Sequence, residues 1–508
     1  MRITVKSSDK SLWEAVCSQL PDMPSYCGGK GRCGKCKVKI LNGEASVSLA
    51  DRQHLSEKEI EEGYRIACQS IPLTDCEIDT DIRNGETEMQ VLSVETAQSA
   101  AKLSSCSIAI DIGTTTLAFA LLGKEGTVIA SGTGLNHQRS FGTDVVSRIE
   151  LAMRGQEAEL TACIRKDIRQ GIKNLLRQKC LPLNKVKHIV VAGNTTMEQL
   201  FFGFPVEGLG KYPFSPYTEN FIKAEYEQLF PDPEEWEMDA GKIPVTGFPC
   251  IAGFVGGDIT SGLYELTQEE TDGVQMFLDI GTNGELACIS KKRIITASTA
   301  AGPVFEGGNI CCGMASLPGA VYATRICEDA LECKIIGDIE PEGICGSGLI
   351  EAVADLLQMK VVDRQGLMLP VWQETGYLLA RGRGDKRIIL TQSDIREFQM
   401  AKAALAAGLD ILCRTAEIKI EESGKFWLAG GLGNGLSVKK AVKTGLLPKC
   451  AGRITFAAGN TSLKGAIRLL REGRQGEEKI AEMLKRTEHV HLANAREFEQ
   501  YYIGHMNF

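Results

Sequence analysis

The chain has 508 residues, of which 43% are hydrophobic and 24% charged, and its formal net charge is −8. This length exceeds what one hydrophobic core organises, so several domains are expected. The negative charge argues against a protein held to nucleic acid by general electrostatics. No stretch reaches the roughly 18 uninterrupted apolar residues of a membrane span, and the start MRITVKSSDK lacks the apolar core of a signal peptide. We therefore expect a cytoplasmic protein that binds neither nucleic acid nor membrane.

Four of the 18 cysteines stand in a metal-ligand pattern near the start of the chain. Cys27, Cys33, Cys36 and Cys68 are separated by five, two and 31 residues. Zinc ribbons normally pair one C-x2-C with another close pair, whereas here three cysteines share a loop and the fourth stands alone. The plant-type 2Fe–2S pattern is C-x4-C-x2-C with a distant fourth cysteine, which differs by one residue in the first gap. The spacing therefore predicts a 2Fe–2S cluster, with zinc as the alternative.

Glycines surround these cysteines, at Gly28, Gly29, Gly31 and Gly34. They allow positive φ angles and bring backbone N–H groups close to the sulfurs, which stabilises the reduced cluster. An alternating strand, MRITVKS, and a short helical stretch precede the loop, and a second strand, KVKIL, leaves it. Together these features resemble the ferredoxin fold in its C-x5-C-x2-C form. The resemblance implies a β-grasp domain over residues 1–85.

Seven cysteines outside the ligand pattern are scattered through apolar segments. We expect them to be small buried hydrophobes in a reducing compartment, because a disulfide framework is typical of small secreted scaffolds. They are Cys17, Cys76, Cys163, Cys180, Cys288, Cys327 and Cys413.

Residues 86–104 are polar and small and have no clear period, so they are expected to form a linker. Such a tether would keep the cluster domain at high effective concentration near whatever the second part binds.

The large remainder, residues 105–508, contains an internal duplication. SIAIDIGTTTLAFALLGKEGTVIASGT predicts three strands joined by tight turns, and VQMFLDIGTNGELACISKKRIITAST repeats the pattern. Asp111 and Asp279 are 279 − 111 = 168 positions apart, so the repeat unit is a whole domain. We expect two lobes, at about residues 105–270 and 271–508.

Each repeat places a carboxylate at a strand end, followed by glycine and hydroxyl or amide residues. Backbone N–H groups and side chains in these turns can cradle phosphate oxygens. Asp111 and Asp279 can hold Mg²⁺ through water or orient an attacking water. The expected phosphate-binding residues are Gly113, Thr114, Thr115, Gly281, Thr282 and Asn283.

A third glycine cluster, FWLAGGLGNG, follows an apolar strand and contains Gly430, Gly431, Gly433 and Asn434. Its spacing is not that of a Rossmann fingerprint. Small residues at a strand end allow an adenine or ribose to lie flat against the backbone. The alternative is a plain strand-to-helix turn.

These turns resemble the phosphate and adenosine elements of the acetate kinase, sugar kinase, Hsp70 and actin superfamily. More narrowly, six segments resemble the ATP-dependent reductive activators of corrinoid proteins. They are IVVAGNTTM, PFSPY, AGFVGGDITSGL, STAAGPVFEGGNICCGM, ICGSGLIEAVADLL and LAGGLGN. The resemblance covers nearly the whole chain and implies an α/β fold with a two-lobed, actin-like or ribonuclease H-like nucleotide-binding core.

The resemblance implies that the protein transfers one electron from its 2Fe–2S cluster to the Co(II) corrinoid of a methyltransferase corrinoid protein and regenerates Co(I). ATP with Mg²⁺ would drive this step, and a low-potential donor would supply the electron. IVVAGNTTM and ICGSGLIEA would let the lobes pack closely and shear. Glu306 would be a catalytic or coupling residue, and Asp258 would face the cleft, unless each is only a structural carboxylate. The superfamily also admits a homodimer.

Three other functions stay open. One is a small-molecule kinase with a redox sensor, in which Asp279 would be the general base. Another is an activator of a 2-hydroxyacyl-CoA dehydratase-type enzyme, although such activators build a cluster between subunits from few cysteines. The third, an assembly or chaperone protein, leaves the cluster motif unexplained. Some relatives carry an additional domain between cluster and core, for which this chain has only the linker, so any dimer contact made by that domain does not carry over.

Overall fold

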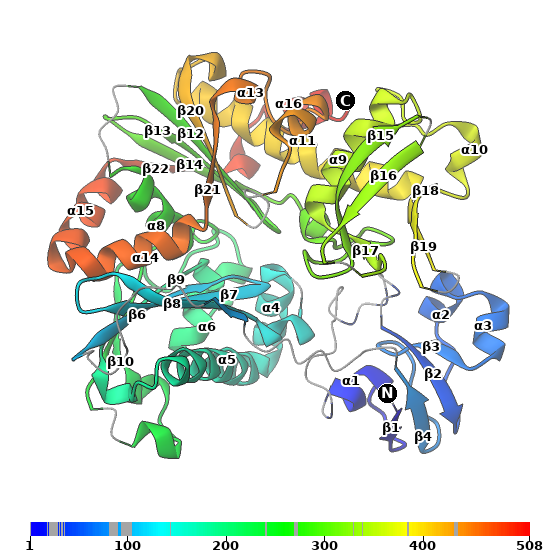
Figure 1. Ribbon diagram of the computed structural model, residues 1–508, viewed down its shortest axis with the longest axis horizontal. Helices are drawn as coiled ribbons and strands as arrows, with labels where there is room; N and C mark the ends of the chain where they lie inside the picture. The colour runs from blue at the N-terminus through cyan, green and yellow to red at the C-terminus, as the bar shows by residue number, and fades with distance from the viewer. Residues whose placement is uncertain are drawn as a thin grey trace. The chain divides into compact units, whose positions relative to one another are not determined.

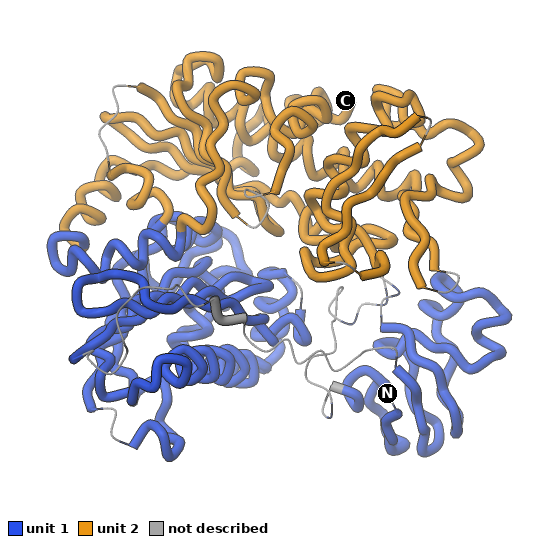
Figure 2. The backbone as a smooth tube through the Cα atoms, in the orientation of Figure 1, with its two compact units in different colours: residues 1–261, 462–476 blue, residues 262–461, 477–508 orange. Residues whose placement is uncertain are grey.

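The structure is a computed structural model. It describes residues 2–17, 19, 29, 31, 34, 36–80, 90–92, 104–142, 144–238, 241–268, 273–328, 330–337, 339–383, 386–430 and 435–508. The chain divides into two compact units, of which unit 1 comprises residues 1–261 and 462–476, and unit 2 comprises residues 262–461 and 477–508 (Figure 2). Within the described ranges, no helix has both the length and the apolar character required to cross a membrane.

The N-terminal part of unit 1 is a four-stranded antiparallel sheet in the order β1-β4-β2-β3. The apolar side of α1, with Leu12, Trp13 and Val16, packs with Val5 and Ile78 of the sheet in one buried cluster. The elements are β1 (Arg2–Val5), α1 (Leu12–Cys17), β2 (Lys37–Asn42), α2 (Leu49–His54), α3 (Glu57–Glu61), β3 (Tyr64–Ile66) and β4 (Cys76–Asp79).

The rest of unit 1 is built on a seven-stranded sheet in the order β10-β11-β9-β6-β7-β8-β5. Strands β6, β7 and β8 form an antiparallel meander, while β9 lies parallel to β6 and β11 lies parallel to β9. The strands are β5 (Gln90–Leu92), β6 (Cys106–Ile112), β7 (Thr116–Gly123), β8 (Val128–Leu135), β9 (Val186–Gly193), β10 (Ile222–Glu225) and β11 (Pro244–Gly247).

The long helix α5 (Glu157–Gln178) covers one face of this sheet (Figure 1). It does so because its apolar residues recur at three- and four-residue intervals and form one buried stripe that includes Leu160, Ile164 and Ile168. The other helices of this part are α4 (Val145–Leu151), α6 (Thr195–Phe202) and α7 (Tyr226–Leu229).

Unit 2 repeats the same pattern in a six-stranded sheet, in the order β21-β20-β12-β13-β14-β22. Strands β12, β13 and β14 form an antiparallel meander, β20 lies parallel to β12, and β21 lies parallel to β20. The strands are β12 (Val274–Ile280), β13 (Gly284–Ile289), β14 (Ile294–Thr299), β20 (Ser423–Ala429), β21 (Thr455–Gly459) and β22 (Thr487–Val490).

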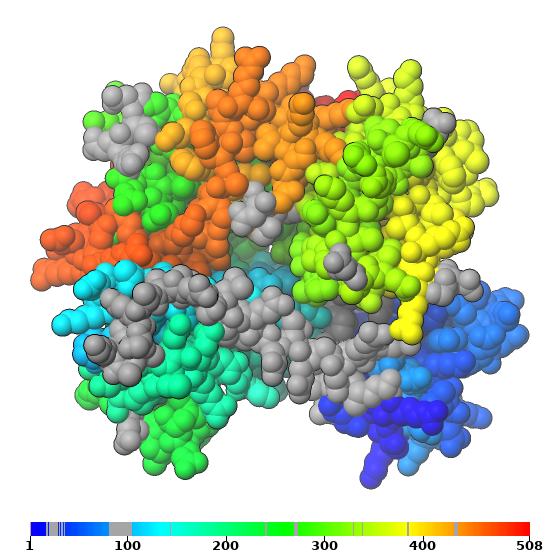
Figure 3. All heavy atoms as spheres, viewed as in Figure 1, coloured from blue at the N-terminus to red at the C-terminus, as the bar shows by residue number. Residues whose placement is uncertain are grey.

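Unit 2 also contains a three-stranded sheet, β16-β15-β17, and the hairpin β18-β19, both of which reach its surface (Figure 3). These strands are β15 (Ala320–Cys327), β16 (Ala330–Ile335), β17 (Gly343–Ile344), β18 (Tyr377–Arg381) and β19 (Arg387–Leu390). The helices are α9 (Gly346–Gln358), α10 (Pro370–Gln373), α11 (Gln392–Thr415), α12 (Val438–Lys443), α13 (Ala451–Ile454) and α16 (Phe498–Gly504). Three further helices contain a residue at which the chain changes unit: α8 (Gly257–Leu266), α14 (Thr461–Glu472) and α15 (Arg474–Lys485).

The predicted duplication is confirmed, because the five strands β11-β9-β6-β7-β8 and the five strands β21-β20-β12-β13-β14 share their order and relative directions.

Within the expected linker the structure shows a short strand that the sequence analysis did not predict. Residues 90–92 form the edge strand β5, where Val91 pairs with Gly132 of β8. A polar segment can still supply main-chain hydrogen bonds to a sheet edge, which needs no apolar period.

The packing of α5 on the sheet depends on a glycine. A Cβ at Gly171 would lie 2.3 Å from Cζ of Phe119 on β7, so Gly171→Ala would overpack this contact and lower the free energy of unfolding by about 1–3 kcal/mol. Denaturant titration of the full chain measures the change. Adding Phe119→Leu makes room for the methyl group, so the double variant should lose less than the sum of the single losses. Strict additivity would contradict the packing argument.

Candidate functional site

The first predicted phosphate turn closes as expected after β6. Asp111 lies one residue before the end of the strand, and the N–H of Gly113 donates to the Thr116 carbonyl at 3.0 Å. A Cβ at Gly113 would lie 2.5 Å from that carbonyl oxygen, so only glycine fits this position without a shift. The hydroxyl of Ser462 donates to Oδ1 of Asp111 at 2.7 Å, which fixes the orientation of the carboxylate.

Two asparagines outside this turn, Asn194 and Asn136, form hydrogen bonds to it. Nδ2 of Asn194 donates to Oγ1 of Thr114 at 3.1 Å. Nδ2 of Asn136 donates to the Gly113 carbonyl at 2.9 Å, and the backbone N–H of Asn136 donates to the Thr115 carbonyl at 3.0 Å. These three hydrogen bonds restrain the conformation of the turn.

A buried arginine completes this bracing and was missed by the sequence analysis. Arg148 of α4 is fully buried, and its Nη2 donates to the Thr114 carbonyl. Its Nε donates to the Gly142 carbonyl at 2.9 Å, and its Nη1 contacts Oε1 of Gln138 at 3.2 Å and Sδ of Met197 at 3.0 Å. No short motif announces this role, since an arginine in a helix usually faces water.

The second turn follows β12 in unit 2 and has a different support. The N–H of Gly281 donates to the Asn283 carbonyl at 2.9 Å. The hydroxyl of Thr282 donates to Oε2 of Glu306 at 2.6 Å, and the Cβ position of Gly281 lies 3.8 Å from Oε1 of the same carboxylate. The structure thus brings the predicted Glu306 into direct contact with the Asp279 turn.

The third glycine cluster begins at Gly430, next to the side chain of Asp279. Ala429 at the end of β20 is in register with Asp279 on the parallel strand β12. Gly430 has φ +82, and a Cβ there would lie 2.4 Å from Oδ1 of Asp279. Glycine is therefore required both by the backbone angle and by the carboxylate. Gly431, Gly433 and Asn434 lie outside the described residues.

An acidic group in unit 1 adds to the surroundings of Asp111. Glu198 of α6 is 2% exposed, and in the described part of the chain its Oε1 has no hydrogen-bond partner. Burial raises the pKa of Glu198 well above its ordinary 4.5, and the charges of Asp258 and Asp111 raise it further. The predicted Asp258 lies in the first turn of α8, where its Oδ1 accepts from the N–H of Ile259 at 2.8 Å.

The two segments expected to connect the lobes are strand-to-helix junctions with close backbone packing. IVVAGNTTM forms the end of β9 and the start of α6, whose N-cap Asn194 accepts from the N–H of Met197 at 3.0 Å. ICGSGLIEA begins α9, where a Cβ at Gly346 would lie 1.9 Å from the Phe305 carbonyl. This close approach supports the backbone next to Glu306. Whether either segment shears stays a prediction.

The cluster domain places two of the predicted ligands together. Cys36 precedes β2 and Cys68 follows β3, and these paired strands put both cysteines at one end of the sheet, where both are buried. The N–H of Ala67 donates to the Cys36 carbonyl at 2.9 Å. Cys27 and Cys33 lie outside the described residues, as does Gly28, and Cys17 is the last residue of α1.

The glycine loop has the backbone that a cluster requires. Gly29, Gly31 and Gly34 all have positive φ, as predicted, and the Cβ position of Gly29 lies 4.0 Å from Cβ of Cys68. His54 Nε2 contacts the Gly31 carbonyl at 2.9 Å, which holds the loop against α2. The loop backbone thus approaches a predicted ligand closely, so the residues present fit a cluster bound by thiolates.

The expectation for the scattered cysteines is only partly correct. Cys76, Cys288 and Cys413 are buried, and burial raises the pKa of Cys288 to about 11. Cys180 and Cys327 are exposed, and Cys163 is partly exposed. Cys180 follows the end of α5, and Cys327 is the last residue of β15. At such positions a residue with apolar sequence neighbours can still be exposed to solvent.

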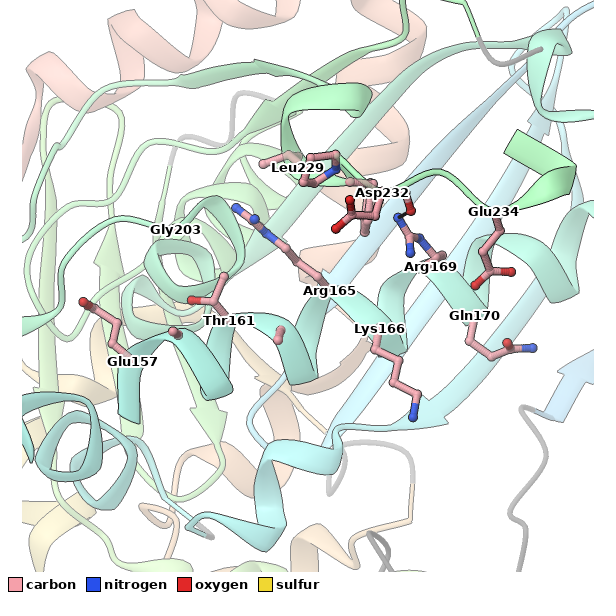
Figure 4. Close-up of a pocket in the computed structure, with 14 residues that line it drawn as sticks. Glu157, Thr161, Arg165, Lys166, Arg169, Gln170, Gly203, Leu229, Asp232 and Glu234 are labelled. Atoms are coloured by element: carbon pink, nitrogen blue, oxygen red, sulfur yellow. Dashed lines mark hydrogen bonds between the residues drawn. The ribbon is translucent and has the colours of Figure 1, made fainter. Parts of the chain in front are cut away.

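A separate groove of about 610 Å³ runs along α5 in unit 1, between that helix and the segment Leu229–Glu234 (Figure 4). None of the predicted site residues lines it. Two of its lining residues are held by contacts of their own, since Lys173 pairs with Glu234 at 2.5 Å and Nη2 of Arg169 donates to the Asp232 carbonyl at 3.0 Å. We assign it no part in nucleotide binding.

Comparison with known proteins agrees with this organisation. Residues 2–73 match the 2Fe–2S iron-sulfur cluster binding domain, residues 106–270 match the RACo middle region, and residues 273–508 match the C-terminal domain of RACo, the ASKHA domain. The chain belongs to the RACo-type family of reductive activators. Its fold class is therefore confirmed as a ferredoxin domain joined to a sugar kinase-like and actin-like core.

Among its relatives is the corrinoid activation enzyme RamQ of Eubacterium limosum, which is 28% identical over 99% of this chain and 97% of that protein. A Co(II) methylated amine-specific corrinoid protein reductase of Methanosarcina barkeri is 26% identical over 79% of this chain and 76% of that protein. A solved structure, the reductive activator for corrinoid, iron-sulfur protein, has a TM-score of 0.70 and 26% identity and covers 99% of this RACo-type chain and 96% of that chain. These likenesses leave the kinase and dehydratase-activator readings without support.

The raised pKa of Glu198 predicts a specific pH dependence of stability. The folded protein keeps this proton above pH 4.5, where the unfolded chain releases it, so the free energy of unfolding falls as pH rises. Glu198→Gln removes this loss. We expect the variant to be more stable than wild type near pH 7, with the difference shrinking towards pH 4.5 in denaturant titrations without nucleotide or Mg²⁺. A difference independent of pH would contradict this assignment.

Proposed function

We propose that this chain reactivates corrinoid proteins of methyltransferase systems by reducing their inactive Co(II) corrinoid to Co(I), and that ATP turnover drives the step. The main support for the proposal is that one chain combines a 2Fe–2S domain with a nucleotide-binding core. This chain is similar to a corrinoid activation enzyme over almost the full length of that enzyme. The geometry around Asp279 supports it, because a carboxylate, a hydroxyl and a left-handed glycine meet there.

The N-terminal domain would hold the electron carrier. Cys27, Cys33, Cys36 and Cys68 would bind the 2Fe–2S cluster, and Gly29, Gly31 and Gly34 shape the loop around it. When bound, the cluster supplies the single electron that reduces Co(II). The chain would shield the cluster, since Cys36 and Cys68 are buried, and the glycine loop would offer it backbone N–H groups.

We propose that both phosphate turns take part in binding ATP. The backbone of Gly113, Thr114 and Thr115 and that of Gly281, Thr282 and Asn283 would contact phosphate oxygens. Gly430, with Gly431, Gly433 and Asn434, would lie against the adenosine. Asp111 and Asp279 would hold Mg²⁺ or orient the attacking water. Glu306 would act through Thr282, to which it is hydrogen-bonded.

ATP is needed for a thermodynamic reason. A plant-type cluster has a potential of roughly −400 mV, and the Co(II)/Co(I) couple is expected to lie lower. Each ~59 mV of an uphill one-electron step costs about 1.4 kcal/mol. A nucleotide can shift such an equilibrium only if one state of the protein or of its complex binds it more tightly.

The proposal also includes the domain bounds, the electron donor, the compartment and the oligomeric state that were expected from the sequence. The cluster domain would occupy residues 1–85, the tether 86–104, and the lobes about 105–270 and 271–508. An upstream low-potential donor would reload the cluster in the cytoplasm, and the protein would work as a monomer or a homodimer. The short tether would keep the cluster close to a corrinoid protein bound by the rest of the chain.

Replacing one ligand tests the cluster assignment. Cys68→Ser should lose bound iron and the visible absorbance of the cluster, because a neutral hydroxyl replaces a thiolate ligand. Cys76→Ser is the matched control, since Cys76 is buried in the same domain but belongs to no ligand pattern. Iron analysis and the visible spectrum of both variants decide the point. Equal iron content in the two would contradict the assignment.

The function is tested by mixing the reduced protein with a Co(II) corrinoid protein, with and without ATP and Mg²⁺, and recording the visible spectrum. We expect Co(I) to appear only with ATP. Asp279→Asn should lower ATP turnover and Co(I) formation at least about 100-fold, as loss of a transition-state electrostatic contact does, while the cluster stays intact. Asp410→Asn, which alters a surface pair with His505, should have no effect. ATP-independent reduction would refute the proposal.

A further inference from the structure

Two adjacent cysteines, Cys311 and Cys312, have no role in the proposed reaction, and the sequence contains no other adjacent pair. Cys311 is exposed and Cys312 is partly exposed, so small oxidants reach the pair. We propose that Cys311 and Cys312 form a reversible dithiol–disulfide pair, and that closing the disulfide disturbs the contact between Glu306 and the Asp279 turn.

The surroundings favour a reactive sulfur at Cys312. A hydrogen bond from the Cys311 thiol lowers the pKa of Cys312 to about 6, and burial opposes this shift without cancelling it. The backbone N–H of Ile389 also donates to Sγ of Cys312, at 3.5 Å. A thiolate is the attacking species in thiol–disulfide exchange, and its partner Cys311 is already within hydrogen-bonding reach.

A disulfide between neighbouring residues is reversible for a geometric reason. The Cα atoms of adjacent residues are about 3.8 Å apart, whereas disulfides usually join Cα atoms about 4.4–6.8 Å apart. Such a ring is strained and therefore easily reduced, which is typical of regulatory rather than structural disulfides.

The pair lies in a loop that has no room to absorb a change. The loop runs from Gly307 to Met314 and closes on itself, since Cβ positions at Gly307 and Gly313 would lie 2.5 Å from the Met314 nitrogen and 2.2 Å from the Gly307 carbonyl oxygen. The N–H of Cys311 donates to Oδ1 of Asp394 at 2.8 Å, which anchors the loop to the start of α11.

Glu306 stands directly before this loop. Its position depends on the backbone at Gly307, whose N–H donates to the Val304 carbonyl at 3.1 Å. A ring that bends residues 311 and 312 would shift the backbone at Gly307, and the hydrogen bond from Thr282 to Glu306 would then break. The effect on ATP turnover rests on the proposed function, whereas formation of the disulfide does not.

The oxidant would be a low-molecular-weight disulfide. The Cys312 thiolate attacks one of its sulfurs and expels the first thiolate. Cys311 then loses its proton and attacks Cys312 in the mixed disulfide, expelling the second thiolate. Two electrons pass from the cysteine pair to the oxidant, which takes up two protons and leaves as two thiols.

The disulfide is tested on the full chain with its cluster, treated without oxygen with oxidised glutathione, alkylated and digested with trypsin. Cleavage after Arg293 and Arg325 releases residues 294–325, whose only cysteines are Cys311 and Cys312. We expect this peptide unalkylated and lighter by two hydrogens. A doubly alkylated peptide, or a stable glutathione adduct, would overturn the proposal.

The coupling is tested by ATP turnover of the same samples, with the visible spectrum showing that the cluster is intact. Oxidation should slow turnover about tenfold, the factor expected from losing one hydrogen bond to a charged group, and dithiothreitol should restore it. Cys312→Ser and Cys311→Ser should resist oxidation, while Cys327→Ser, an exposed cysteine of the same unit, should remain sensitive.

The outcomes separate the two claims. A disulfide with unchanged turnover would overturn the coupling. Inhibition that persists in both Cys311→Ser and Cys312→Ser would also overturn it. If the reduced wild type does not turn over ATP at all, the proposed function fails, and the mass of peptide 294–325 still decides whether the pair forms.

Discussion

Arg148 lies with its whole guanidinium group out of water, so its N–H groups need acceptors within the protein. They find them in the Gly142 carbonyl, the Gln138 amide and the Thr114 carbonyl, and the last of these belongs to the first phosphate turn. A guanidinium that lost one of these acceptors would be buried with an unsatisfied donor, which costs about 1–3 kcal/mol or more. The turn, residues 138–142 and helix α4 are therefore fixed together, and the Asp111 carboxylate is presented on this support.

The second turn is built on the same strand pattern but is held differently. A carboxylate, Glu306, accepts from Thr282, and Gly430 packs against Asp279. In the first turn Arg148 and Asn136 donate to backbone carbonyls, and Asn194 donates to the Thr114 hydroxyl. In the second turn, the supporting carboxylate of Glu306 belongs to the short helical turn Pro303–Glu306. The second turn is thus supported by fewer of the contacts described above than the first, which is why the proposed disulfide is expected to act there.

Much of this could be predicted from the sequence where the signal is local. The strand–turn–strand units around Asp111 and Asp279 follow from alternation and a short glycine turn, and the glycine loop follows from cysteine spacing. What the sequence could not give depends on contacts between distant segments. Arg148 has no local mark that separates it from a surface arginine, and the approach of Gly430 to Asp279 follows from the parallel pairing of β12 with β20. Cys180 and Cys327 were expected to be buried because their neighbours are apolar, but exposure is set by position in the fold.

The energetics explain why an electron carrier and a nucleotide core share one chain. A coupling free energy of about 1–3 kcal/mol is typical of two linked binding events. For a one-electron step it corresponds to about 40–130 mV, at ~59 mV for each 1.4 kcal/mol. Such a shift is useful only if the carrier delivers its electron while the favoured state lasts. A tether serves this purpose by keeping the carrier at high effective concentration, so that transfer is not limited by a second encounter. The same reasoning favours oxidative inhibition of ATP turnover. Oxidation that disabled only the electron carrier would let ATP turnover continue without an electron to transfer.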